Sequence, residues 1–158
     1  MTTIRGSADA RGRRFAIVAS RFNEIIVTKL VDGARAWFDR HGVGEGEVDT
    51  VWVPGAFELP IAARRLASTG SYDAVVCLGA VIRGETPHFD HVAAQAAEGI
   101  RRAGEDTGVP VVFGVLTTDT FEQAIDRAGG AHGNKGWDSA AAAAEIASVL
   151  EQLPKGEP

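Results

Sequence analysis

Apolar and polar residues alternate along the chain in blocks that predict strands and helices in turn. Short, nearly continuous apolar runs are typical of strands buried on both faces of a sheet. Such runs occur at Phe15–Ser20, Ala74–Ile82 and 111–116, and Val48–Val53, which Pro54-Gly55 ends, is expected to be a further strand. Because segments of helical spacing separate them, we expect parallel strands joined by right-handed crossovers. The pattern therefore predicts an α/β fold, a three-layer sandwich with a four-stranded parallel sheet flanked by helices on both faces.

The first three helices are predicted from apolar residues that recur every three or four positions. Asn23 is expected to cap the first helix, which ends near His41. Its apolar positions are Ile26, Leu30, Ala34, Trp37 and Phe38. A short second helix carries Pro60 in its first turn, where proline is tolerated. Asp90 is expected to cap the long third helix, which closes at Gly108.

Two further helices are predicted near the end of the chain. One is expected at 120–128, where Thr120 and Gln123 have the spacing of a capping box. The last begins near Gly136 and is rich in alanine. We expect it to pack through an apolar stripe made of Ile146, Val149, Leu150 and Leu153.

The length and composition fit one globular domain. Of the 158 residues, 45% are hydrophobic, and a chain of this length can bury roughly 70% of its unfolded surface. We expect a single domain over 1–158, with loose tails at about 1–11 and 154–158. Cys77 is the only cysteine, which excludes an internal disulfide and a multi-cysteine metal site.

Charge and hydropathy narrow the range of partners. The net charge is −5, so no global positive field is available to bind nucleic acid or an anionic membrane. The longest apolar stretches, Ala74–Ile82 and 109–116, are far shorter than the ~20 residues that span a bilayer. No secretory signal is readable near the N-terminus. We therefore expect a cytoplasmic protein that binds small molecules and neither nucleic acid nor a membrane.

Candidate chemistry is expected where the predicted strands end. In open parallel sheets, ligands bind beyond the carboxyl ends of the strands, where loops converge and helix amino termini present free N–H groups. This rule selects the loops at 20–23, 54–58, 82–91 and 116–119. Because the net charge is negative, any anionic ligand must be bound by groups within these loops or close to them.

Two of these loops carry side chains that have two interpretations each. Phe22 precedes the expected cap Asn23 and could stack on a flat ligand or pack as a hydrophobic staple. Glu58 could reach a ligand or stabilise the start of a helix through the macrodipole. For both residues, the spacing alone favours the structural interpretation.

Residues 83–91 hold the densest group of reactive side chains. The sequence Arg-Gly-Glu-Thr-Pro-His-Phe-Asp-His places two imidazoles, two carboxylates and a guanidinium in one loop. Thr86 and nearby amides can form an anion-binding loop, and an imidazole such as His88 is suited to proton transfer near neutral pH. One alternative is a pair of solvated histidines with Asp90 as the cap. Another is a metal at His88 and His91, but no third ligand has motif spacing.

Three residues in the last third of the chain also have open roles. Strand alternation makes Phe113 a core residue by default, or an exposed residue used by a ligand or another subunit. Arg127 and Lys135 flank a glycine-rich turn, and two cations beside such a turn could bind a phosphate group. Alternatively, the charge of Arg127 could simply stabilise the negative end of a helix dipole. The turn is not a P-loop, because Gly-Lys-Ser/Thr is absent.

Taken in order, the loop motifs resemble those of the lumazine synthase family (6,7-dimethyl-8-ribityllumazine synthase). The most specific are Gly-Ala-Val-Ile-Arg-Gly-Glu-Thr-Pro-His-Phe-Asp at 79–90 and Gly-Val-Leu-Thr-Thr-Asp at 114–119. The resemblance runs from about Phe15 to Leu150. It implies a flavodoxin-like sandwich and a transferase of riboflavin biosynthesis. The implied reaction condenses 5-amino-6-(D-ribitylamino)uracil with 3,4-dihydroxy-2-butanone 4-phosphate, the penultimate step, without a metal or an organic cofactor.

The resemblance also implies a role for each matched residue. His88 matches the proton-transfer residue, and Phe22 matches the ring that stacks on the pyrimidine. Phe113 matches an aromatic that closes the pocket from a neighbouring subunit. The positions that hold the pyrimidine ring and its ribityl chain match Ala56, Phe57, Glu58, Ala80, Val81 and Ile82. The phosphate-binding positions match Glu85, Thr86, Arg127 and Lys135.

The resemblance finally implies assembly. Active sites are expected between neighbouring subunits of a homopentamer, and the turn from Arg127 to Lys135 is similar to that of members that form sixty-subunit icosahedral capsids. At this turn, Gly130-Ala131-His132 and Trp137-Asp138 depart from the family pattern. Riboflavin synthase is a further expected partner. The alternative function is that of a non-catalytic lumazine- or flavin-binding protein or a shell-forming paralogue.

Overall fold

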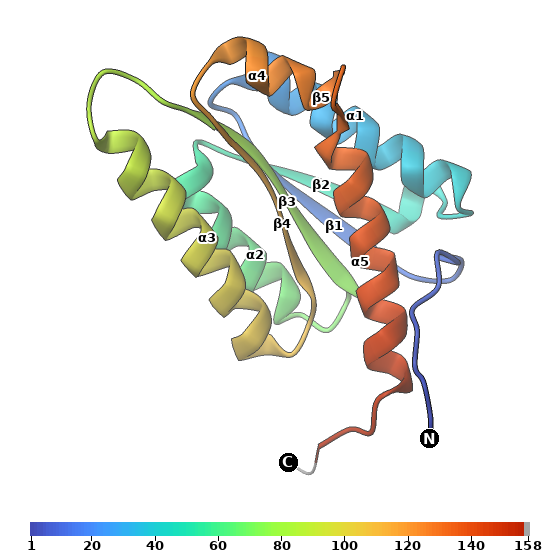
Figure 1. Ribbon diagram of the computed structural model, residues 1–158. Coiled ribbons are helices and arrows are strands. Elements are labelled where there is room, and N and C mark those ends of the chain that lie inside the picture. The colour runs from blue at the N-terminus through green and yellow to red at the C-terminus, as the bar shows by residue number, and fades with distance from the viewer. Residues whose placement is uncertain (157–158) are drawn as a thin grey trace.

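The computed structural model describes residues 1–156, and a parallel sheet lies at its centre (Figure 1). The sheet has the order β2-β1-β3-β4, and each neighbouring pair is parallel. Its strands are β1 (Phe15–Ser20), β2 (Val48–Val53), β3 (Ala74–Ile82) and β4 (Val111–Thr118). The order 2-1-3-4 is that of flavodoxin-like sheets. The predicted α/β class and the four-stranded parallel sheet are thus confirmed.

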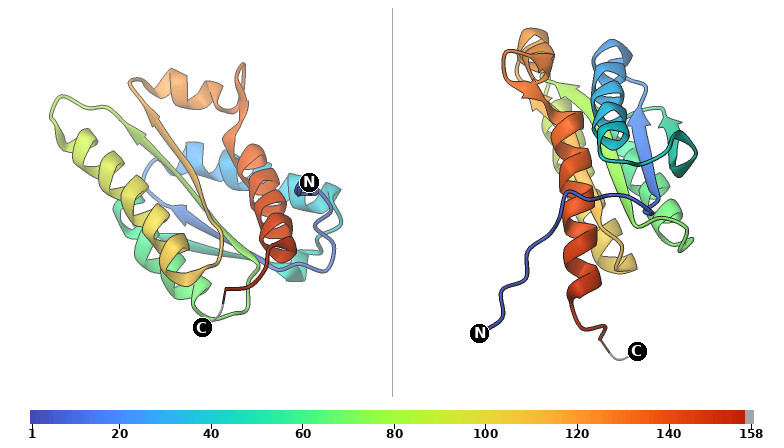
Figure 2. Two further views of the ribbon diagram at one scale, coloured as in Figure 1. Left: turned by 60° about the horizontal axis from the view of Figure 1, so that its bottom comes forward. Right: turned by 90° about the vertical axis from the view of Figure 1, so that its right-hand side faces the viewer.

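Helices cover both faces of this sheet, which gives three layers (Figure 2). The α-helices are α1 (Glu24–Arg40), α2 (Leu59–Ala67), α3 (His88–Thr107), α4 (Phe121–Asp126) and α5 (Lys135–Gln152). The helices α2 and α3 pack on one face, and α1, α4 and α5 pack on the other. Short 3-10 turns lie at Glu45–Glu47 and Ala56–Glu58. A small hairpin of β5 (Ala128–Gly130) and β6 (Gly133–Asn134) precedes α5.

The alternation of side chains along β1 divides the core in two. Phe15 and Ile17 face the layer of α1, α4 and α5, whereas Ala16 and Val18 face the layer of α2 and α3. All four side chains are fully buried. A strand buried on both faces is why its sequence is continuously apolar rather than alternating.

The start of two helices differs from expectation. Asn23 occupies the cap position of α1, but it has a left-handed backbone (φ 60°) and its side chain does not cap the helix. Instead its Nδ2 donates a hydrogen bond to the carbonyl of Ala80 at 2.8 Å. Asp90 is not the cap of α3 either, because the helix begins at His88 and Asp90 lies in its first turn. The predicted end of α3 is confirmed, because Gly108 caps the helix with a left-handed backbone.

The packing of α5 is opposite to the prediction. The expected stripe is exposed or half-buried: Ile146, Leu150 and Leu153 are 38%, 39% and 40% exposed, and Val149 is half-buried. The buried face consists of small residues, namely Gly136, Ser139, Ala140, Ala143, Ala144, Ala147 and Ser148. The physical reason is the close approach of α5 to α1, where a Cβ on Gly136 would overlap the backbone of Leu30. Large side chains cannot fit between helices at that distance.

The region after β3 contains two further differences. β4 extends to Thr118 rather than residue 116, because its last residues pair with the end of β3. The helix expected at 120–128 is shorter, although Thr120 and Gln123 form the predicted capping box. The chain then forms the β5–β6 hairpin, which was not predicted. Gly129 and Gly133 have positive φ angles there, which suits glycine.

The first residues are more ordered than a loose tail. Ala10 is fully buried, and the Ser7 N–H donates to Ser148 Oγ of α5 at 2.7 Å. Arg13 forms an ion pair with Glu151 at 2.6 Å. Part of the segment 1–11 therefore packs along α5, as Figure 2 also shows. Of the tail expected at 154–158, residues 157–158 lie outside the described part of the chain. Within residues 1–156, no helix has the length and apolar character needed to cross a membrane.

Candidate active site

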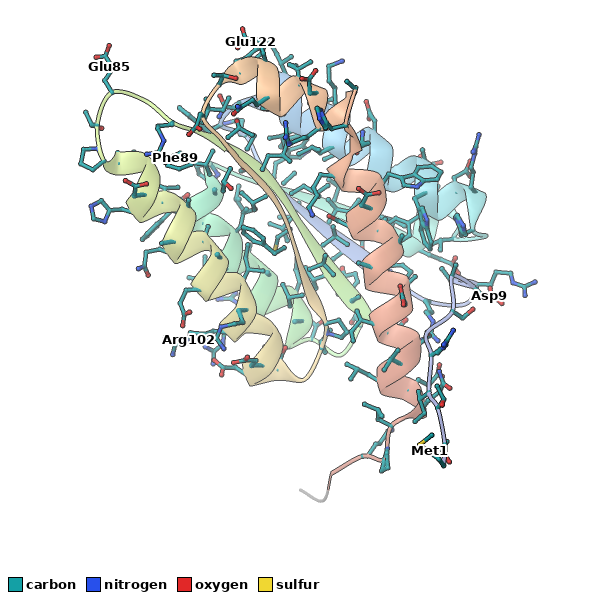
Figure 3. The ribbon with its side chains drawn as sticks, in the orientation of Figure 1. Met1, Asp9, Glu85, Phe89, Arg102 and Glu122 are labelled. Atoms are coloured by element: carbon teal, nitrogen blue, oxygen red, sulfur yellow. The ribbon has the colours of Figure 1, made fainter. Side chains whose placement is uncertain are left out.

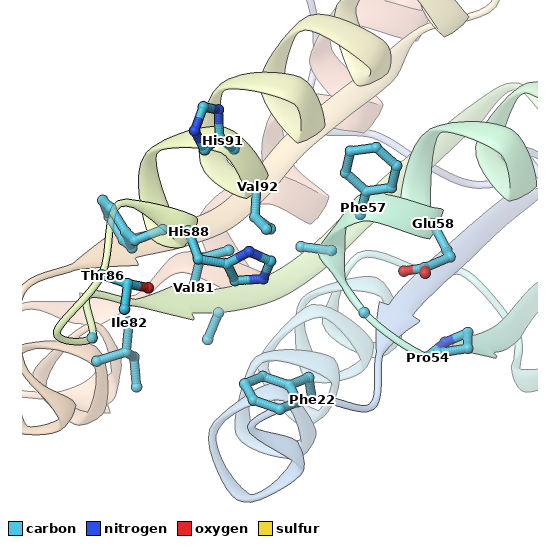
Figure 4. Close-up of a pocket in the computed structure, with 15 residues that line it drawn as sticks. Phe22, Pro54, Phe57, Glu58, Val81, Ile82, Thr86, His88, His91 and Val92 are labelled. Atoms are coloured by element: carbon cyan, nitrogen blue, oxygen red, sulfur yellow. The ribbon is translucent and has the colours of Figure 1, made fainter.

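A cavity of about 710 Å³ opens at the carboxyl ends of β1 and β3 (Figure 4). Its lining comes from Phe22, Pro54, Gly55, Ala56, Phe57, Glu58, Ala80, Val81, Ile82, Gly84, Thr86, His88, Phe89, His91 and Val92. Most of these residues belong to three of the four loops selected from the sequence, and Ala80, Val81 and Val92 come from β3 and α3 beside them. In a sheet of order 2-1-3-4, the switch point lies between β1 and β3, which is where flavodoxin-like proteins bind ligands.

The loop after β1 is held from both sides, which fixes Phe22 at the cavity. The N–H groups of Arg21 and Phe22 donate to the carbonyls of Val53 and Pro54, at 2.8 and 3.0 Å. Asn23 reaches across to Ala80, as described above. The ring of Phe22 is 72% exposed, so the staple interpretation is wrong. An exposed ring on a fixed loop is suited to stacking against a flat ligand.

The loop after β2 forms another wall of the cavity. Gly55 has an extended backbone, and the Glu58 N–H donates to its carbonyl at 3.1 Å. Ala56 is buried beneath the loop, whereas the ring of Phe57 is 60% exposed. Glu58 lies at the start of α2 and also lines the cavity. Its position is therefore compatible with both interpretations, stabilisation of the helix start and contact with a ligand.

The end of β3 and the start of α3 complete the cavity. Ala80, Val81 and Ile82 line it from the strand, and Thr86 lines it from the following loop. His88 is the first residue of α3, and Figure 4 shows its imidazole directed into the cavity. The imidazole can therefore meet a ligand held against the strand ends.

The cavity also contains residues to which no role was assigned from the sequence. Phe89, His91 and Val92 line it from α3. His91 lies one helical turn after His88, and Val92 follows at the four-residue spacing, so helical periodicity from His88 was the signal for both. Among the described residues, no three or more His, Cys, Asp or Glu side chains are grouped as metal ligands.

A second cavity of about 420 Å³ lies beside β4, α4 and the start of α5. Its lining includes Phe113, Arg127, His132, Lys135 and Asp138. Phe113 is 38% exposed, so the core assignment favoured by strand alternation is wrong. β4 is an edge strand of the sheet, so no further strand lies beside Phe113.

The two cations at the second cavity are linked through the backbone. The Lys135 N–H donates to the Arg127 carbonyl at 2.9 Å. Arg127 caps α4, and its Nη1 donates to the carbonyl of Gln123 at 3.0 Å. The helix-end interpretation of Arg127 is therefore confirmed, and the same side chain also lines the cavity.

The structure thus divides the predicted site residues into two groups. The first cavity gathers Phe22, Ala56, Phe57, Glu58, Ala80, Val81, Ile82, Thr86 and His88. The second gathers Phe113, Arg127 and Lys135. Glu85 lines neither cavity, and Figure 3 shows its side chain pointing outward from the tip of the loop. Within one chain, Thr86 and the two cations do not share a cavity.

Cys77, the lone cysteine, takes no part in either cavity. It is fully buried in β3, and burial raises the pKa of its thiol to about 12. A thiol that stays protonated is a poor nucleophile. Cys77 is therefore a packing residue.

The fold and the first cavity define a class: a flavodoxin-like α/β protein with a small-molecule cleft at the β1/β3 switch point. Comparison with protein families identifies the particular family. The family model described as 6,7-dimethyl-8-ribityllumazine synthase matches residues 12–151 of the 158, and the chain belongs to this family. The family is one of transferase-type enzymes in riboflavin biosynthesis.

Proposed function

We propose that this protein catalyses the condensation of 5-amino-6-(D-ribitylamino)uracil with 3,4-dihydroxy-2-butanone 4-phosphate to 6,7-dimethyl-8-ribityllumazine. Membership of the family supports the proposal. The observation that carries it further is the first cavity, where three strand-end loops bring together the imidazole of His88 and the exposed ring of Phe22. Such a cavity can hold a flat ring and move protons at its edge.

The proposed reaction requires repeated proton transfers but no redox step. The primary amine of the uracil attacks the ketone, and loss of water gives an imine. Loss of the proton from the carbon that bears the neighbouring hydroxyl then expels phosphate and leaves an enol, which tautomerises to a ketone. Attack of the second amine on this new carbonyl, with loss of another water, closes the pteridine ring. Each step moves a proton to or from nitrogen, oxygen or carbon. In this proposal His88, directed into the cavity, serves as the general acid and base.

The other residues of the first cavity bind the uracil substrate in this proposal. Phe22 stacks on the pyrimidine ring, because its exposed ring lies on a loop fixed at both sides. Backbone groups and one carboxylate hold the edge of the ring and the ribityl hydroxyls. These contacts are assigned to Ala56, Phe57, Glu58, Ala80, Val81 and Ile82.

The phosphate group is assigned to both cavities together. Thr86 supplies a hydroxyl in the first cavity, and Arg127 and Lys135 supply positive charge in the second. Glu85 contributes through its backbone N–H only, since its carboxylate would repel phosphate and points outward. Because the groups are divided within one chain, we infer that a complete site forms between two copies.

The division of the predicted site residues between two cavities also supports a homo-oligomer whose active sites are shared by neighbouring subunits. Phe22 and Phe113 are both exposed in the single chain, and two such aromatics next to cavities are costly to leave in water. In the proposed assembly, a cyclic homopentamer, Phe113, Arg127 and Lys135 of one subunit cover the first cavity of the next. A heterologous interface of this kind closes into a ring when its rotation allows. Further assembly into a capsid stays a prediction of the sequence.

The direct test mixes the purified protein with the two substrates and follows lumazine by absorbance and phosphate by a colorimetric assay. Formation of both products in equal amounts supports the proposal. Binding of the uracil substrate without either product would favour the non-catalytic alternative.

A second test asks whether sites are shared. His88→Ala and Arg127→Ala subunits are coexpressed to form mixed oligomers. If His88 and Arg127 of different subunits form one site, random mixing restores about one quarter of the sites to wild type. Activity is measured at a low concentration of the phosphate substrate, where both parent variants are slow. If each site lies within one chain, no wild-type site can form and the activity of the mixture stays at the average of its parents. A fully active monomer in sedimentation would also contradict the shared site.

A further inference from the structure

Arg83 stands at the exit of β3, where the loop that carries Thr86 begins. Its backbone N–H donates to the Thr118 carbonyl of β4 at 2.9 Å. Its side chain makes three contacts. Nε donates to Asp119 Oδ1 at 2.9 Å, Nη1 donates to Asp90 Oδ1 at 3.3 Å, and the guanidinium carbon lies 4.4 Å from the centre of the Phe89 ring.

Two of these contacts fall on residues adjacent to His88. The first turn of α3 consists of His88, Phe89 and Asp90, and its cap residue Pro87 makes no side-chain capping hydrogen bond. A helix start without a capping side chain frays more easily. The face of the Arg83 guanidinium packs on the ring of Phe89, and one of its N–H groups donates a hydrogen bond to Asp90. It thereby ties the turn that carries His88 to the end of β4.

Arginine is suited to this position because its guanidinium is planar. The same group can donate to two carboxylates in its plane and stack on an aromatic ring with its face, whereas lysine offers a single point charge. The two carboxylates in turn raise the pKa of Arg83 above its usual range. Each exposed ion pair contributes little alone, so the combination of three contacts is what restrains the turn.

We propose that Arg83 is a positioning residue for His88. Arg83 itself lines neither cavity, but it fixes the first turn of α3 and so the distance from the imidazole to the bound substrate. The proposal rests on the proposed function, in which His88 transfers protons. Displacement of a reacting group by a fraction of an ångström lowers the rate of the chemical step more than it lowers binding.

The test compares Arg83→Gln with a matched control, Arg101→Gln. Arg101 lies further along α3, is similarly exposed, and pairs with two carboxylates, Glu98 at 2.9 Å and Glu105 at 2.6 Å. Both variants remove one positive charge and its ion pairs. We expect Arg83→Gln to lower kcat by about tenfold, with KM for both substrates changed by less than about twofold. Arg101→Gln should retain the wild-type kcat.

Further variants test whether the contacts of Arg83, rather than its positive charge alone, determine kcat. Asp119→Asn keeps Arg83 but weakens one of its contacts, and it should lower kcat in the same direction. The double variant with Arg83→Gln should be no slower than Arg83→Gln alone, because both changes remove the same link. Arg83→Lys keeps the charge but cannot make all three contacts, and it should leave kcat well below wild type.

Amide hydrogen exchange gives a readout that does not require activity. Arg83→Gln should exchange faster than wild type at residues 88–91, and Arg101→Gln should not. If the wild-type protein forms no lumazine, the proposed function fails while the exchange experiment still tests the restraint. The proposal is overturned if Arg83→Gln keeps wild-type kcat and exchange, if Arg101→Gln loses as much activity, or if Arg83→Lys restores full kcat.

Discussion

Replacement of Gly136 by alanine tests the close contact between α1 and α5. A Cβ at this position would lie 2.6 Å from the carbonyl carbon of Leu30 and 2.9 Å from its Cα. Ordinary van der Waals contact begins at 3.4 Å, and the carbonyl oxygen of Leu30 would be nearer still, so the helices must separate by more than an ångström. The obstacle is backbone, which cannot turn aside as a flexible side chain would.

The magnitude follows from two opposing effects. Overpacking against backbone costs about 3 kcal/mol, the upper part of the usual range. Alanine is favoured over glycine in a helix by up to about 1 kcal/mol. The net loss in the free energy of unfolding is therefore about 2 kcal/mol, which lowers Tm by roughly 4–8 °C for a chain of this length.

The control is a second helical glycine with room for a methyl group. A Cβ on Gly104 would meet Val109 O and Val111 N at 3.4 Å, which is ordinary contact. Gly104→Ala should therefore raise Tm by about 2 °C through the loss of chain entropy in the unfolded state. The same substitution thus has opposite signs at the two positions.

The assay is thermal unfolding followed by circular dichroism, at one fixed protein concentration because assembly shifts Tm. Gly136→Ala should also raise KM for the phosphate substrate, since α5 begins at Lys135. An unchanged Tm for Gly136→Ala, or an equal fall for Gly104→Ala, would refute the reasoning from the interhelical contact.

Three other outcomes are expected. His88→Ala should mainly lower kcat and Arg127→Ala should mainly raise KM for the phosphate substrate, and steady-state kinetics that show raised KM alone in both would contradict the assigned roles. Ser20 Oγ is buried without a hydrogen-bond partner among the described residues, so Ser20→Ala should raise the free energy of unfolding in urea by about 1 kcal/mol, and a clear loss would mean that the hydroxyl is satisfied. The Cys77 thiol has a pKa of about 12 in the folded chain against 9.0 ordinarily. The unfolded chain therefore loses this proton first as pH rises, and stability falls between about pH 9 and 12, by about 1.4 kcal/mol at pH 10. Cys77→Ala should lack this slope, and an identical slope would assign it to other groups.

Much of the fold could be predicted because the signals are local or periodic. β1, β2 and β3 have the predicted bounds. β1 and most of β3 are buried on both faces and are therefore apolar throughout, whereas the edge strand β2 is recognised by the Pro54-Gly55 pair that ends it. The capping box of Thr120 and the left-handed Gly108 were also predictable, because each depends on neighbouring residues alone.

The errors occur where distant segments decide the outcome. Asn23 bonds to Ala80, which is 57 positions away, and not to its own helix. The apolar stripe that contains Ile146 has helical spacing, but α5 lies so close to α1 that only its small residues fit between the two helices, and these are the residues that are buried. Spacing identifies an apolar face and does not tell which neighbour covers it.

The candidate site divides in the same way. The loops that line the first cavity could be predicted, because strand ends in parallel sheets converge at one edge. That Phe113, Arg127 and Lys135 line a different cavity could not, because their separation depends on the position of β4 at the edge of the sheet.

The sequence by itself determined the α/β class, the strands, most helix boundaries and the loops that carry chemistry, since these follow from periodicity and local hydrogen bonding. Its motifs also indicated the family. The tertiary structure alone decided which residues share a cavity, which face of α5 is buried, and that Arg83 links the turn of His88 to β4. These are contacts between segments far apart in the chain, and their distances are set by how the layers pack, which no local pattern encodes.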